Sequence, residues 1–233
     1  MREATDIGGR TARVGVVCDT HVGDVLPSLP DEVCAALAGV DLIIHAGDVT
    51  SRGVIDRLEA IAPVVAVRGN HDRLLDDLPE DVVVTVAGVR IGVTHGRRNR
   101  AAEVCSVFAG LVIGRPVTLG LARALRRRVG RVDCLVFGHY HLPFHQRVGG
   151  TDVVSPGALY VIDADPTAVF SGLRALAFRR FRSGLPAEAR VPAIGILHIE
   201  DRRIRLQRIP LSGPLRSGSA SATPYRMPST PGK

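Results

Sequence analysis

Five short polar motifs follow apolar runs along this chain, and each run is about the length of one buried β-strand. In chain order the motifs are Asp19-Thr20-His21, Gly47-Asp48, Gly69-Asn70-His71-Asp72, Thr94-His95-Gly96 and Gly138-His139-Tyr140-His141. The first three runs alternate with segments of helical periodicity, which predicts right-handed βαβ units and a parallel sheet. Because the carboxyl ends of parallel strands share one edge of a sheet, we expect the polar motifs to meet there.

The rest of the pattern predicts an α/β protein with a mixed sheet layered by helices. Strands are expected at 13–18, 42–46, 63–67, 82–86, 89–94, 134–137, 152–154, 194–199 and 204–209. Helices are expected at 31–38, at 51–61 with Ser51 as N-cap, and within the basic stretch 97–131, which is broken near 114–116.

The boundaries of the folded part follow from composition. One domain is predicted over residues 12–210, interrupted by a basic amphipathic insertion at 166–192. The C-terminal segment 211–233 is rich in Ser, Pro, Gly and Thr, which predicts a disordered tail. Residues 1–11 are polar and are also predicted to be a disordered tail.

Size and cysteine usage limit the class of protein. A chain of 233 residues that is 45% hydrophobic can bury one sizeable core. Its apolar runs are strand-sized, far below the ~20 residues of a transmembrane helix, and its first ten residues do not resemble a signal peptide. Four cysteines without close pairing are typical of free thiols in a reducing compartment. We therefore expect a cytoplasmic protein.

The five motifs contain side chains of the types that bind divalent metals in proteins. Asp19, Asp48 and Asn70 each follow a strand of the predicted parallel sheet, and His95 and His139 follow two later strands. This donor set suits two adjacent cations of the borderline kind, such as Mn, Fe, Zn or Ni, better than Ca. A carboxylate must bridge two such cations to offset their repulsion, and Asp48 is the candidate.

Two metals side by side indicate phosphoester chemistry, in which a bridging water loses its proton and becomes the attacking hydroxide. His71 lies next to Asn70 and is predicted either to protonate the leaving oxygen as a general acid or to stabilise charge on the phosphorus centre. His45 lies inside a strand, so packing or support of a ligand is expected of it rather than ligation. His145 and His198 lie outside the motifs and are predicted to be structural.

The order of the motifs resembles that of the calcineurin-like metallophosphoesterases. The resemblance is strongest to their small bacterial and archaeal phosphodiesterases, which are relatives of a scaffolding subunit of retromer. It covers about residues 12–165 and resumes over 193–210. It implies a four-layer α-β-β-α sandwich and a hydrolase, most simply a phosphodiesterase, acting on a small phosphoester or a nucleotide. Manganese is the expected metal, with Fe, Zn, Ni or Mg as alternatives.

The resemblance also assigns the ligands. It places one metal among four side chains, namely Asp19, His21, Asp48 and His141. It places the other among Asp48, Asn70, His95 and His139, with Asp48 shared. The catalytic histidine of the family falls on His71, a position where many small members have cysteine.

Three further hypotheses stay open. The first is that the protein is a scaffold with vestigial activity, although no ligand position of the family has been lost. The net charge of −2 over residues 1–165 and +9 over 166–233 would also suit a nucleic-acid phosphodiesterase or contact with an anionic membrane. Arg97 and Arg98, which follow His95, are candidates to hold phosphate oxygens or to form a solvated loop. The oligomeric state is not indicated.

Overall fold

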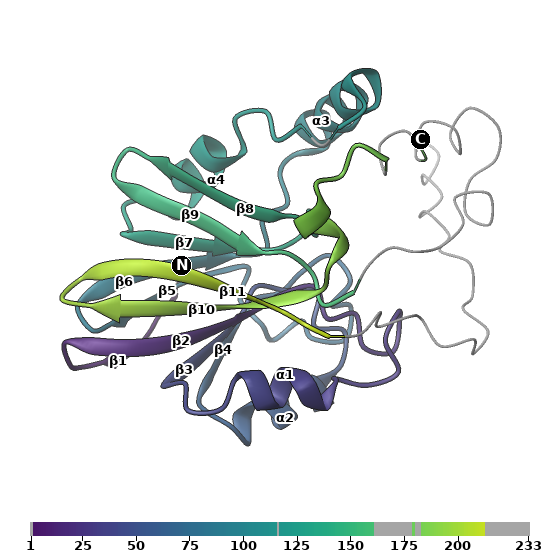
Figure 1. The fold of residues 1–233 in the computed structure, drawn as a ribbon. Coiled ribbons are helices and arrows are strands. Elements are labelled where there is room, and N and C mark those ends of the chain that lie inside the picture. Colours follow the sequence, from purple (N-terminus) through teal and green to yellow (C-terminus); the bar gives the residue numbers. More distant parts are fainter. Residues whose placement is uncertain (1, 116, 161–178, 180–182, 213–233) are drawn as a thin grey trace.

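Two mixed β-sheets face each other, and helices cover their outer faces (Figure 1). The computed structural model describes residues 2–115, 117–160, 179 and 183–212. This arrangement confirms the predicted α-β-β-α sandwich with mixed sheets.

The five-stranded sheet contains the predicted parallel unit. Its order is β11 (Arg203–Pro210), β10 (Ala193–Glu200), β2 (Thr11–Val17), β3 (Leu42–His45) and β4 (Val64–Ala66). The last three of these strands are parallel to one another, and β10 joins β2 in antiparallel register. Helices α1 (Asp31–Ala36) and α2 (Arg52–Glu59) connect the parallel strands. The C-terminal hairpin therefore completes a sheet that begins near the N-terminus.

The six-stranded sheet contains two antiparallel hairpins and three parallel strand pairs. Its order is β1 (Arg2–Ile7), β5 (Asp81–Val86), β6 (Val89–Thr94), β7 (Cys134–Phe137), β9 (Thr151–Pro156) and β8 (Pro143–Val148). The chain passes from β6 to the parallel strand β7 through α3 (Arg100–Ile113) and α4 (Leu121–Val129). This crossover places the ends of β6 and β7 at the same edge of the sheet.

Apolar side chains hold the four layers together. One buried cluster fills the space between the sheets, with Val16 and Ile44 on one side and Val93 and Val136 on the other. A second cluster packs α1 and α2 on the five-stranded sheet, and a third packs α4 on the six-stranded sheet. The core between the sheets fixes their separation, on which the metal centre described below depends.

Three details of the fold differ from what the sequence predicted. The N-terminal segment 1–11, expected to be a disordered tail, contains β1, which pairs in parallel with β5. Strand β8 was not predicted, because its sequence PFHQRV lacks an apolar run and much of it is exposed. Ser51 occupies the N-cap position of α2 as expected, but its side chain makes no capping hydrogen bond.

Most of the predicted insertion and almost all of the predicted C-terminal tail lie outside the described residues. Within the segment 166–192, residue 179 and residues 183–192 are described, including a short 3₁₀ helix at Ala187–Arg190. The proposals of nucleic-acid or membrane contact through the basic C-terminal third therefore remain predictions. No helix among the described residues is both long enough and apolar enough to cross a bilayer.

The packing of α2 predicts a stability effect. Leu58 is completely buried between α2 and the five-stranded sheet. We expect Leu58→Ala to lower the free energy of unfolding by about 2–5 kcal/mol, measured by urea denaturation, because it leaves a cavity. Glu59→Ala, on the exposed side of the same helix, is the control. A loss below about 1 kcal/mol for Leu58→Ala would contradict the assigned packing.

Candidate metal centre

Strand ends from both sheets converge on one site. Asp19 and His21 follow β2, Asp48 follows β3, and Asn70 and His71 follow β4. His95 follows β6 directly, and His139 and His141 follow β7. The structure thus brings all eight predicted site residues to the edge where the parallel strands of both sheets end, as expected for α/β folds.

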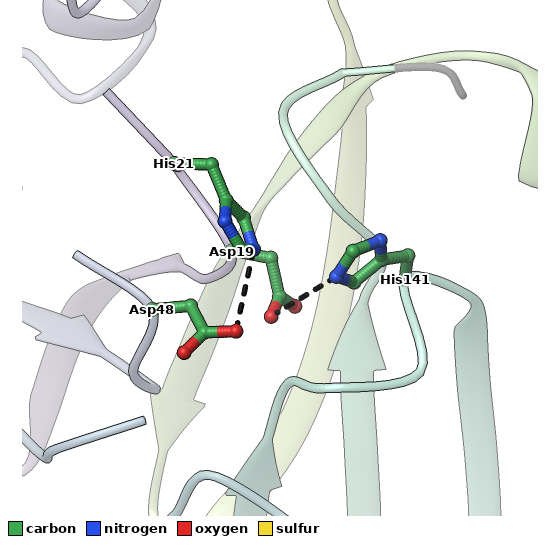
Figure 2. A group of neighbouring side chains, drawn as sticks. All are labelled: Asp19, His21, Asp48 and His141. Atoms are coloured by element: carbon green, nitrogen blue, oxygen red, sulfur yellow. Dashed lines mark ion pairs between the residues drawn. The ribbon is translucent and has the colours of Figure 1, made fainter. Parts of the chain in front are cut away.

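Four of these side chains could together hold a metal ion. Asp19, His21, Asp48 and His141 each offer a ligand atom within 4.8 Å of the others, and Figure 2 shows the four side chains pointing toward one another. His141 Nε2 lies 3.5 Å from Asp19 Oδ1. The Nε2 atom of His21 is buried and has no hydrogen-bond partner among the described residues, so a cation beside Asp48 would satisfy it.

The carboxylate of Asp48 lies between the two predicted ligand sets. Its Oδ2 is 3.3 Å from His21 Nε2 and 3.3 Å from His95 Nε2. Its Oδ1 accepts a hydrogen bond of 2.8 Å from the backbone N–H of His71. One oxygen is therefore held by the backbone, and the other faces a histidine of each predicted metal set.

The side chains of the second predicted ligand set also lie close to one another. His95 Nε2 is 3.0 Å from Asn70 Oδ1, and the rings of His95 and His139 are 5.0 Å apart. His95 Nδ1 lies 2.9 Å from the backbone carbonyl of Ala46, which can hold the ring as the Nδ1–H tautomer. Nε2 of His95 then faces Asp48 and Asn70 with a lone pair suitable for a metal.

Buried charges are balanced within the cluster. Although burial opposes ionisation, the neighbouring imidazoles of His21 and His95 hold the pKa of Asp48 well below its usual range. The pKa of Asp19 is also lowered, against the effect of burial, by His141. The buried carboxylates therefore stay ionised and require positive charge beside them, which protonated histidines or divalent cations supply.

The backbone of the site is strained. Asp19, His21, Asp48, His139 and His141 all have positive φ, between 45° and 70°. This conformation costs of order 1–3 kcal/mol for a residue with a side chain and persists at sites where function requires it. The strain thus supports a functional role for the positions that the motifs singled out.

The glycines of two motifs allow close backbone approach. A Cβ atom at Gly69 would lie 2.2 Å from Oδ1 of Asp48, and one at Gly138 would lie 2.8 Å from Oδ2 of Asp19. Any side chain at either position would displace a carboxylate of the site. This contact explains why glycine precedes the polar residues in both motifs.

Asp72 fixes the loops that carry the ligands, a role that the sequence did not reveal. Its buried carboxylate accepts hydrogen bonds from the backbone N–H groups of Asp48 at 2.9 Å, Thr50 at 2.6 Å and Gly69 at 2.7 Å. One side chain therefore ties the loop after β3 to the loop after β4. Its place at the end of the Gly69–Asp72 motif was the only signal in the sequence.

A second supporting network comes from α3. Glu103 Oε2 lies 3.8 Å from His139 Nε2, and Glu103 Oε1 accepts hydrogen bonds from the Tyr140 hydroxyl and the Arg98 backbone N–H. Although burial opposes it, the contacts with His139 and Tyr140 lower the pKa of Glu103 to about 2. Nothing in the sequence around Glu103 indicated this contact, because helix α3 is brought to the site by tertiary packing.

The two arginines after His95 have different environments. The Arg98 side chain is only 7% exposed, and its guanidinium donates to the Tyr140 hydroxyl, Ser106 Oγ and the Leu119 carbonyl. These contacts leave it unsuited to the phosphate contact for which it was a candidate. Arg97 is exposed and stays a candidate.

The remaining histidines lie where they were expected. His45 Nε2 is buried 3.2 Å from Thr20 Oγ1, and burial lowers the pKa of His45 to about 4, so it is neutral. His145 pairs with Asp152, and His198 lies 2.8 Å from Gln207 Oε1. Two contacts were not foreseen: Asp24 Oδ2 is 3.6 Å from His71 Nδ1, and Tyr160 Oη is 3.2 Å from His141 Nδ1.

The sequence matches the calcineurin-like phosphoesterase superfamily domain over residues 13–171. The chain belongs to this superfamily, a class of metal-dependent phosphoric ester hydrolases, which confirms the resemblance seen in its motifs.

Particular relatives agree with this class. A probable metallophosphoesterase of Methanocaldococcus jannaschii is 37% identical over 150 residues, which are 64% of this chain and 69% of the relative. A phosphodiesterase of the same organism is 24% identical over 160 residues, or 62% of this chain and 82% of the relative. Vacuolar protein sorting 29 of Cryptosporidium parvum has the same fold, with a TM-score of 0.58 and 19% identity over 88% of this chain and all of that one.

The contacts of Asp72 predict coupled effects on stability and metal binding. In Asp72→Asn the neutral amide can no longer accept three N–H bonds as a carboxylate does. We expect the free energy of unfolding to fall by about 1–3 kcal/mol and manganese affinity to fall about 10–100-fold. Urea denaturation and titration calorimetry measure the two effects. The exposed Asp76→Asn is the control, and unchanged manganese affinity in Asp72→Asn would contradict the positioning role.

Proposed function

We propose that the protein is a phosphodiesterase that uses two divalent metals, with manganese as the first choice and Fe, Zn, Ni or Mg as alternatives. The observation that carries the proposal is the position of Asp48 Oδ2, 3.3 Å from one histidine of each ligand set. A shared carboxylate at this point can bridge two cations and offset their mutual repulsion.

Each cation has its own protein ligands in this proposal. Asp19, His21 and His141 join Asp48 around one cation, and Asn70, His95 and His139 join it around the other. When bound, such cations polarise phosphoryl oxygens and lower the pKa of water, which supplies the nucleophile. The buried, preorganised donors hold this chemistry in place, because Asp72 and the backbone N–H of His71 prevent Asp48 from turning.

His71 is assigned the role of general acid. Its side chain is 27% exposed, and its ring makes an edge contact with His21 at 4.7 Å between centroids. It therefore lies at the border between the buried ligands and the solvent, where a leaving group departs. Burial lowers the pKa of His71 from its ordinary value, and the carboxylates of Asp48 and Asp24 oppose this shift. Asp24 faces Nδ1, so we assign Nε2 as the proton donor to the leaving oxygen.

A diester is the preferred substrate class in this proposal. The relative from M. jannaschii that is named a phosphodiesterase aligns with 62% of this chain. A pocket of about 870 Å³, lined in part by Asn70 and His95, adjoins the second ligand set. It provides room for the second organic group that distinguishes a diester from a monoester.

Metal dependence is the first test. We expect metal-stripped protein to be inactive on bis(p-nitrophenyl) phosphate and manganese to restore turnover, with slower turnover of p-nitrophenyl phosphate. Asp48→Asn should lose activity to background and bind fewer than two manganese ions by calorimetry. Asp56→Asn, on the exposed side of α2, is the matched control. Full activity in Asp48→Asn or in the absence of metal would disprove the dinuclear proposal.

The role of His71 predicts a different pattern. His71→Ala should retain two bound manganese ions but lower kcat by about 10²–10⁴-fold. The loss should be larger for aryl diesters with poorer leaving groups, because these need the proton most. His145→Ala, which removes an exposed histidine of β8 that lies outside the motifs, is the control. Loss of a manganese ion in His71→Ala would identify the residue as a ligand instead.

A further inference from the structure

A basic pocket adjoins the second ligand set of the metal centre. It is lined by Asn70 and His95, by the loop that follows His71 and by residues of α4, and its volume is about 870 Å³. This volume lies within the ~300–1,000 Å³ range of small-molecule sites and exceeds what a single phosphate group needs. The pocket is therefore large enough for a substantial part of a substrate held at the metals.

Arginines dominate the charge of this pocket. Five of them line it, together with the acidic residues Asp72 and Glu80. Asp72 is occupied by three backbone N–H groups, and Glu80 is shared between Arg68 at 3.4 Å and Arg128 at 3.2 Å. The carboxylates of the lining thus have partners already, and the pocket keeps a positive excess.

Two of these arginines have no side-chain partner among the residues that the structure describes. Arg73 and Arg97 make no side-chain hydrogen bond or ion pair within the described part of the chain, whereas Arg98 and Arg128 are both engaged. Each follows a predicted site residue by two positions, Arg73 after His71 and Arg97 after His95. Both are exposed, so their guanidinium groups can reach an anion in the pocket.

The backbones of both arginines are anchored. The N–H of Arg73 donates to the His71 carbonyl at 2.9 Å, and the carbonyl of Arg97 accepts from Arg128 Nη1 at 3.2 Å. Their Cα positions are therefore fixed relative to the metal centre while their side chains stay available. Guanidinium groups favour paired hydrogen bonds to phosphate oxygens, which makes a phosphate the fitting ligand.

We propose that Arg73 and Arg97 bind a second phosphate group of the substrate, so that the preferred substrates are phosphodiesters whose organic part carries a further phosphate. This proposal rests on the proposed phosphodiesterase function. It adds a specificity site that lies outside the two ligand sets and outside the position of His71. In it, the reacting phosphate lies at the metals and the second phosphate lies in the arginine pocket.

The test uses two chromogenic diesters that differ only in the remote phosphate. These are thymidine 5′-(p-nitrophenyl phosphate) and the same compound with a 3′-phosphate. We expect the manganese-loaded protein to have a kcat/KM at least fivefold higher for the 3′-phosphorylated substrate. Arg73→Ala and Arg97→Ala should each lower this ratio toward one, because each removes one charge-assisted contact with the remote phosphate. Arg127→Ala, which removes an exposed arginine of α4 outside the pocket, should keep the ratio.

A binding measurement separates the two proposals. Calorimetry with thymidine 3′,5′-bisphosphate and thymidine 5′-phosphate, on metal-free protein, tests the pocket without turnover. Tighter binding of the bisphosphate that is lost in the Arg73→Ala/Arg97→Ala double variant would support the pocket even if neither diester were hydrolysed. Turnover of both diesters at equal kcat/KM, with equal binding of the two nucleotides, would overturn the pocket and leave the phosphodiesterase function intact.

Discussion

The carboxylate of Asp48 connects the two sheets at the metal centre. Its Oδ2 lies 3.3 Å from His21, which follows a strand of the five-stranded sheet, and 3.3 Å from His95, which follows a strand of the six-stranded sheet. The distance between the two ligand sets is therefore set by how the sheets pack on each other. The apolar cluster between the sheets fixes that packing, so the geometry of the site depends on the core.

The candidate metal centre lowers the stability of the fold. Five of the predicted ligands have left-handed backbone conformations, at about 1–3 kcal/mol each, and two buried carboxylates remain ionised. Asp72 and Glu103 stabilise this arrangement by accepting hydrogen bonds from the backbone and side chains around it. A fold that carries such costs at one edge needs its stability from the helices and sheets elsewhere, where the three apolar clusters lie.

The arginines near the candidate metal centre lie in two kinds of environment, one buried and one exposed. Arg98 is almost fully buried in a network with Tyr140 and Glu103, and it supports the His139 side of the metal centre. Its neighbour Arg97 is exposed at the adjoining pocket, as is Arg73. Consecutive residues of the same type therefore lie in different environments: the Arg98 guanidinium is held by protein groups, and the Arg97 side chain is exposed at the pocket.

The sequence by itself determined a mixed α/β fold, because short apolar runs alternate with helical segments, and the family that its motifs resemble implied the sandwich. It also predicted that the eight candidate site residues meet at one edge, because each motif comes soon after a short apolar run and strand ends share an edge. Those relations are local. Tertiary structure alone decided that Asp72 clamps two loops, that Glu103 reaches His139, that Arg98 is buried and Arg97 exposed, and that β1 and β8 form edges of a sheet. These outcomes depend on contacts between residues far apart in the chain, or on which face of a loop is covered. Polar residue types and spacing alone do not specify such contacts.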